Sequence, residues 1–90
     1  MRVRRQFVIT GRVQGVGYRW FTYDAAVREG VDGWVRNLPD GRVEAEIEGE
    51  IEAVDRVEAA LRRGPAGSRV DDVNRDERAP SGRRTGFSIR

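Results

Sequence analysis

Apolar and polar residues alternate over the first thirteen positions of the chain. The odd positions hold most of the apolar side chains, together with one arginine and one glycine: Val3, Arg5, Phe7, Ile9, Gly11 and Val13. Alternation with a period of two is typical of a strand that buries one face. We therefore predict a first strand whose odd positions face the core.

Two later stretches have helical periodicity instead. Residues 21–29 place Phe21, Ala25 and Arg28 on one side, and Gly30 behind them suits the left-handed conformation that ends helices. Residues 51–63 have a clearer apolar stripe at steps of three and four, and it ends before Gly64. Helices are predicted over both ranges.

The remaining periodic segments indicate strands. We predict strands over 33–37 and 42–48, joined as an antiparallel hairpin by the turn at 38–41, which contains Pro39 and Asp40-Gly41. A weaker strand is predicted from Val70 to about position 77. Its Val70 and Val73 lie three positions apart, which indicates a bulge or an irregular start. A polar loop over 78–84 precedes a short final strand at 86–89.

The predicted order is strand, helix, strand, strand, helix, strand, followed by one short strand. This order is typical of a ferredoxin-like α+β sandwich, in which two helices cover one face of an antiparallel sheet. Ninety residues without a linker or an internal repeat are expected to form a single domain over 1–90.

Composition excludes several kinds of chemistry. The chain has no cysteine, no histidine and no lysine, and all 17 basic residues are arginine. Thiol nucleophiles, a catalytic histidine, a lysine Schiff base and a Walker-type phosphate loop are therefore excluded. The net charge of +2 does not by itself indicate a nucleic-acid partner. No apolar run is long enough to span a membrane, and a cytoplasmic location is expected.

Candidate chemistry concentrates between the first strand and the first helix. Gly11, Gly15 and Gly17, three of the 11 glycines, lie here, and Arg19 follows where the helix is expected to begin. Backbone N–H groups converging in a glycine-rich turn bind anions, and a helix N-terminus adds positive dipole charge. An arginine beside them can grip a phosphate through two hydrogen bonds. The stretch predicts a phosphate-binding loop.

Two motifs carry a family resemblance. The run Gly11-Arg-Val-Gln-Gly-Val-Gly-Tyr-Arg19 resembles the first signature of the acylphosphatases, with Tyr18 where phenylalanine is common. The run Gly33-Trp-Val-Arg-Asn37, followed by Asp-Gly-Arg-Val-Glu at 40–44 and by Gly49, is similar to their second signature. The second helix and the last strand also fit, so the resemblance covers essentially the whole chain.

This resemblance implies hydrolysis of a small-molecule acyl phosphate to carboxylate and phosphate, without metal or cofactor. It implies that Arg19 binds the phosphate and that Asn37 orients the attacking water. Because acyl phosphates are already activated, positioning and charge stabilisation are sufficient for catalysis. We expect a monomer, with no nucleic-acid or membrane partner. The substrate-binding residues are expected to be Gln14, Gly15, Val16, Gly17, Tyr18 and Arg19.

Two other functions fit the predicted fold. It could be a non-catalytic module that binds single-stranded RNA on its open sheet face, or a regulatory domain that binds a small ligand. If alternate residues of strand 42–48 face the helices, its three glutamates lie on the open face, where carboxylates repel phosphate. Both tryptophans, Trp20 and Trp34, are expected to be packing residues rather than a binding platform.

Overall fold

The computed structural model describes all residues, 1–90, as seven elements. In chain order they are β1 (Arg2–Arg12), α1 (Tyr18–Glu29), β2 (Asp32–Asn37), β3 (Val43–Glu50), α2 (Ile51–Arg63), β4 (Arg69–Arg78) and β5 (Phe87–Ile89). This is the predicted βαββαβ order with an added C-terminal strand. Neither helix has the length and apolar composition that a membrane span needs.

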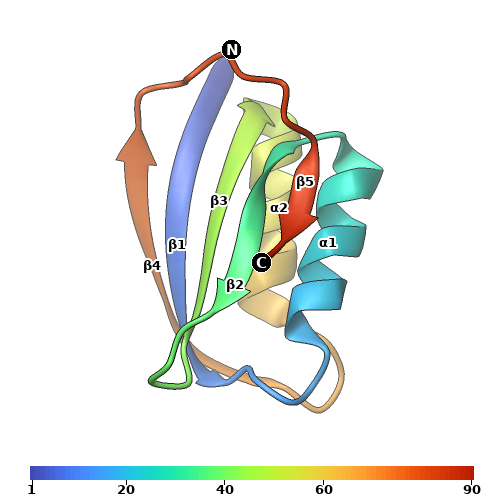
Figure 1. Cartoon of the computed structure of the whole chain (residues 1–90), viewed down its shortest axis with the longest axis vertical. Helices are drawn as coiled ribbons and strands as arrows, with labels where there is room; N and C mark the ends of the chain where they lie inside the picture. Colours follow the sequence, from blue (N-terminus) through green and yellow to red (C-terminus); the bar gives the residue numbers. More distant parts are fainter.

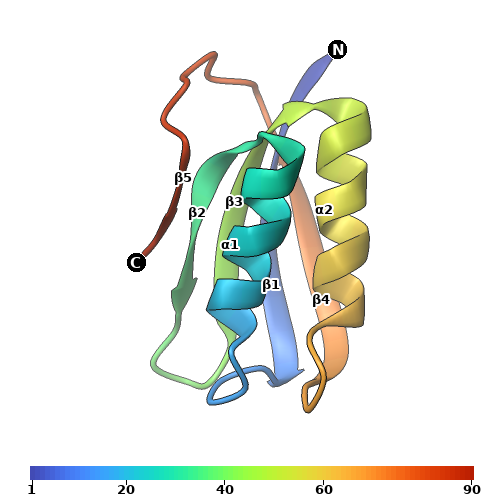
Figure 2. The ribbon, with the colours of Figure 1, turned by 90° about the vertical axis from the view of Figure 1, so that its right-hand side faces the viewer.

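One five-stranded sheet forms the first layer and the two helices form the second. The strands lie in the order β4-β1-β3-β2-β5 (Figure 1), and both helices pack on the same face (Figure 2). The predicted two-layer sandwich is confirmed. Strand β5 differs from the expected antiparallel pattern because it pairs with β2 in parallel. The segment before β5 crosses the end of the sheet first (Figure 1), so β5 then runs in the direction of β2.

The core lies between the sheet and the helices. Phe7 and Ile9 of β1 are fully buried there, as the alternation predicted. The inward residues of β3 and the apolar stripe of α2 complete the core: Val43, Ala45, Ile47, Val54, Val57 and Leu61. The buried face of β3 therefore follows the sequence pattern, and its glutamates point to the open face.

A charged residue, Arg5, also lies on the buried face of β1. Its guanidinium is 2.6 Å from Asp55 Oδ1 and 3.1 Å from Glu58 Oε1, both on α2, and 2.9 Å from Glu77 Oε1 on β4. Burying an arginine is tolerated when carboxylates accept its hydrogen bonds. This cluster therefore ties α2 to two strands beside the apolar core.

Helix α1 begins at Tyr18, three residues before the predicted start at Phe21. Gly17, at the N-cap, has a left-handed backbone with φ of 78°, and no side chain caps the helix. The usual signal for a helix start, a Ser, Thr, Asp or Asn cap, is therefore missing from the sequence.

In β4 the predicted bulge is confirmed, because the register against β1 shifts between Thr10 and Gly11 and leaves Asp71 unpaired.

The open face of the sheet has an ionic network. The β3 glutamates Glu44, Glu46 and Glu48 pair with Arg36, Arg4 and Arg2, respectively. Glu48 is only 4% exposed. Burial opposes its ionisation, but hydrogen bonds from Ser81, from Arg2 and from the Gly82 amide outweigh burial and lower the pKa of Glu48 to about 2. This carboxylate thereby fastens the segment before β5 to the sheet.

We expect Glu48→Gln to alter acid unfolding. A carboxyl pKa that folding lowers from 4.5 to about 2 stabilises the folded state above pH 4.5, and this stabilisation is lost between about pH 4.5 and about pH 2. The variant should lose up to about 3 kcal/mol of unfolding free energy at pH 7 and show a flatter decline below pH 4.5.

Denaturant unfolding at pH values from 2 to 7 measures this difference. Glu52→Gln is the matched control, because Glu52 is exposed and has no ion-pair partner. If Glu48→Gln and wild type decline in parallel below pH 4.5, the pKa shift assigned to Glu48 is contradicted.

Candidate active site

The predicted site residues come together at one end of the molecule. Residues 13–17 connect β1 to α1, and β2 ends beside them at Asn37 (Figure 2). Between these segments lies a pocket of about 120 Å³, which we call the loop pocket. It is lined by Val13, Gln14, Gly15, Gly17, Tyr18, Arg19, Trp20 and Asn37.

Two glycines shape the backbone of this loop. Gly15 and Gly17 have φ angles of 74° and 78°, in the left-handed region that other residues rarely adopt. A Cβ atom at either position would meet nothing within 4 Å. The requirement for glycine is therefore conformational rather than steric. Turns of this kind point successive N–H groups into one concavity.

The N–H groups at this end of α1 are free to bind a ligand. The amides from Gly15 to Arg19 donate to no acceptor in the chain, and the first turn of α1 has neither a capping side chain nor an acidic residue. The first N–H groups of a helix carry partial positive charge and need acceptors. An anion would satisfy both requirements, so this geometry suits a phosphate.

Arg19 adds a full positive charge. It lines the loop pocket, and no aspartate or glutamate side chain lies within 4 Å of its guanidinium. Its Nη1 donates a hydrogen bond of 3.3 Å to the main-chain oxygen of Arg90, just beyond β5. A guanidinium has five N–H donors, so most remain available to an anion in the pocket.

Asn37 contributes a neutral polar group from the other side of the loop. It is the last residue of β2 and is opposite the buried Val43 in the β2–β3 hairpin. Its side chain makes no hydrogen bond within the chain, although it lines the loop pocket. An uncommitted amide of this kind can accept one hydrogen bond from a ligand or water and donate others.

Gln14 connects the loop to that hairpin. Its Nε2 donates to the carbonyl oxygens of Leu38 at 2.8 Å and Arg42 at 3.0 Å. Both N–H bonds of the side-chain amide are therefore used within the protein. The contacts fix the loop relative to Asn37, and direct binding of substrate by Gln14 stays a prediction.

Val16 and Tyr18 can contribute only their backbone to the loop pocket. Val16 packs against the core and does not line the pocket. The Tyr18 side chain is buried, its hydroxyl donates to the Leu61 carbonyl at 2.6 Å, and burial raises its pKa well above the ordinary value. The phenol is thus a packing group and no candidate for proton transfer.

Trp20 lines the loop pocket although the sequence did not indicate it. It is 65% exposed, so the expectation that it is a packing residue was wrong. The sequence pattern predicted a helix that starts at Phe21, so Trp20 fell outside it and the direction of its side chain was not predicted. In a helix that begins at the buried Tyr18, position 20 is rotated by about 200° from that residue and faces outward.

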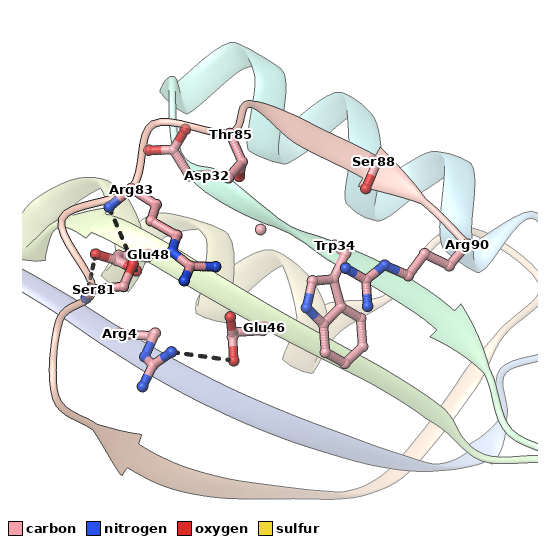
Figure 3. A pocket seen from close by; sticks show the side chains of 11 residues that line it. Arg4, Asp32, Trp34, Glu46, Glu48, Ser81, Arg83, Thr85, Ser88 and Arg90 are labelled. Carbon is pink, nitrogen blue, oxygen red and sulfur yellow. Dashed lines mark hydrogen bonds and ion pairs between the residues drawn. The ribbon is translucent and has the colours of Figure 1, made fainter.

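A larger pocket of about 450 Å³ lies on the open face of the sheet, which the helices do not cover (Figure 3). We call it the sheet-face pocket. None of the predicted site residues lines it. Two of its carboxylates, Asp32 and Glu48, already accept hydrogen bonds from Arg2, and Arg90 stacks on Trp34 with its guanidinium carbon 4.6 Å from the ring centroid. No group of acidic, histidine or cysteine side chains in the chain could hold a metal ion.

The fold and the loop pocket define a ferredoxin-like sandwich with a glycine-rich strand-to-helix loop whose amides have no partner in the chain. Comparison with known protein families identifies one family with this fold: the model of the acylphosphatase family matches residues 5–89. The chain belongs to the acylphosphatase family.

Individual relatives agree with this classification. An acylphosphatase from Anaeromyxobacter dehalogenans (strain 2CP-C) is 51% identical over 89 residues, which cover 99% of this chain and 96% of that protein. The crystal structure of an acylphosphatase from Bacillus subtilis superposes with a TM-score of 0.91 at 38% identity, covering 97% of each chain. The acylphosphatase from Coxiella burnetii gives 0.92 at 29% identity, covering 99% of this chain and 93% of the other.

Proposed function

We propose that this acylphosphatase hydrolyses the carboxyl-phosphate bond in the loop pocket, using Arg19 and Asn37. The observation that carries the assignment is that three groups with free hydrogen-bonding capacity lie at one small pocket. These are the backbone N–H groups of Gly15 to Arg19, the Arg19 guanidinium without an aspartate or glutamate partner, and the free side-chain amide of Asn37.

Phosphate binding accounts for two of these groups. The N–H groups hold the phosphoryl oxygens, and the Arg19 guanidinium neutralises the charge that develops as the bridging bond breaks. The leaving group is a carboxylate, which is a weak base, so no acid is needed to protonate it. The lack of a titrating side chain other than Tyr18 in the loop pocket is therefore compatible with catalysis.

Asn37 accounts for the attacking water. Its carbonyl oxygen accepts a hydrogen bond from the water and aligns it for attack on phosphorus. An amide cannot remove a proton at neutral pH, so a phosphate oxygen of the substrate takes the proton. Gln14 supports this step indirectly, because its bonds to the hairpin fix the distance between the loop and the end of β2.

The remaining expectations about partners stay predictions. They comprise no metal or cofactor, no nucleic-acid or membrane partner, a monomeric state and a cytoplasmic location. Glu44 and Glu46 of the open face are each paired with an arginine, and Arg36 and Arg90 cover the Trp34 ring, so this face has an ionic network where RNA binding needs free aromatic rings.

Arg19→Lys should reduce kcat for acetyl phosphate by about 10²–10³-fold, because a point charge cannot replace a bidentate planar fork. Phosphate release is measured with a chelator present, since no step is assigned to a metal. Arg28→Lys is the matched control, with the same substitution at an exposed position of α1 outside the loop pocket. Near-normal turnover of Arg19→Lys, or a strict need for added metal, would contradict the mechanism.

Asn37→Ala should reduce kcat by about 10²-fold, through loss of water alignment, while the inhibition constant of inorganic phosphate changes much less. Steady-state kinetics with phosphate as inhibitor separates the two effects. Asn74→Ala, at an exposed position of β4, serves as the control. If Asn37→Ala weakens phosphate binding and leaves kcat unchanged, Asn37 is a substrate ligand and does not position water.

A further inference from the structure

The loop pocket is small. Its volume is about 120 Å³, whereas pockets that enclose drug-sized ligands have about 300–1,000 Å³. The proposed function places the phosphoryl group and the attacking water inside this pocket. A bulky acyl group must then extend to the rim of the pocket, where it contacts side chains that are exposed.

Among the apolar residues that line the loop pocket, only one has exposed surface. Val13 and Tyr18 are 1% and 2% exposed and belong to the core, whereas Trp20 is 65% exposed. Trp20 directly follows Arg19 in the first turn of α1. Among the residues that line the loop pocket, the indole of Trp20 is therefore the one apolar surface that an acyl group at the rim can contact.

The indole of Trp20 packs against a second aromatic ring, which packs against a third. The rings of Trp20 and Tyr23 meet edge to face, with centroids 5.7 Å apart and an interplanar angle of 75°. Tyr23 in turn lies 6.4 Å from the ring of Phe87 on β5. No arginine stacks on Trp20, although arginines cover Trp34 and Phe21. A supported ring with free surface is suited to contact an aromatic or apolar group.

We propose that Trp20 forms the acyl-group subsite and gives the enzyme a preference for aromatic and bulky apolar acyl phosphates over acetyl phosphate. The inference rests on the proposed function, because it places the phosphate in the loop pocket. Contact with Trp20 removes apolar surface of the acyl group from water before and during the reaction. Such uniform binding lowers KM and leaves kcat nearly unchanged.

The test compares kcat/KM for benzoyl phosphate with kcat/KM for acetyl phosphate. Wild type should prefer benzoyl phosphate, and Trp20→Ala should lower the ratio about tenfold, mainly through KM for benzoyl phosphate. Trp20→Phe should restore most of the ratio. Val27→Ala is the matched control and should keep the wild-type ratio, because Val27 is an exposed apolar residue of α1 outside the loop pocket.

A second measurement does not depend on substituting Trp20. In a Trp34→Phe background, Trp20 is the only tryptophan. A methylene phosphonate analogue of benzoyl phosphate, which cannot be hydrolysed at that bond, should shift the fluorescence of Trp20 more than inorganic phosphate at equal saturation. Equal effects of the two ligands would show that the acyl portion does not reach Trp20.

Failure of this inference can be told apart from failure of the proposed function. If wild type hydrolyses both substrates but Trp20→Ala leaves their ratio unchanged, the acyl subsite is rejected and the phosphate site stands. If wild type hydrolyses neither substrate, both are overturned. A change in oligomeric state on Trp20→Ala with an unchanged ratio would identify the exposed side of α1 as a contact between copies and overturn the subsite.

Discussion

The site depends on a group of backbone amides that have no partner within the protein. The N–H groups from Gly15 to Arg19 lie in the loop before α1 and in its first turn, beside the loop pocket, and no side chain satisfies them. Such a turn is accessible only because Gly15 and Gly17 adopt left-handed conformations. Unpaired amides are unfavourable unless water or an anion accepts from them. The loop is thus held ready for a ligand by the fold around it.

Contacts from distant segments hold this loop in place. Gln14 fastens it to the β2–β3 hairpin, whose β2 strand ends at Asn37, and so holds the glycine loop beside the end of β2. The main chain of Arg90, next to β5, accepts a hydrogen bond from Arg19. The ionic cluster of Arg5 and the apolar core keep α2 against the sheet. The charged groups that hold α2 against the sheet are therefore separate from Arg19, which has no aspartate or glutamate partner.

Local patterns predicted the strands, the helices and the irregularity in β4, and the family resemblance predicted the grouping of Arg19 with Asn37 near the glycine loop. They could not predict features that depend on long-range geometry. The start of α1 has a left-handed Gly17 in place of a capping side chain, so the helix was predicted too short and the outward direction of Trp20 was missed. The bonds from Gln14 to the hairpin and the parallel pairing of β5 depend on how distant segments pack, which no local spacing records.

Amide chemical shifts of the uniformly ¹⁵N-labelled protein, followed while inorganic phosphate is added, test the phosphate cradle most directly. If the loop pocket holds phosphate, the largest shifts occur at the amides of residues 15–19, and the side-chain Nε resonance of Arg19 moves with the same affinity. Larger shifts around Arg83 and Thr85 of the sheet-face pocket, with residues 15–19 unmoved, would contradict the assignment.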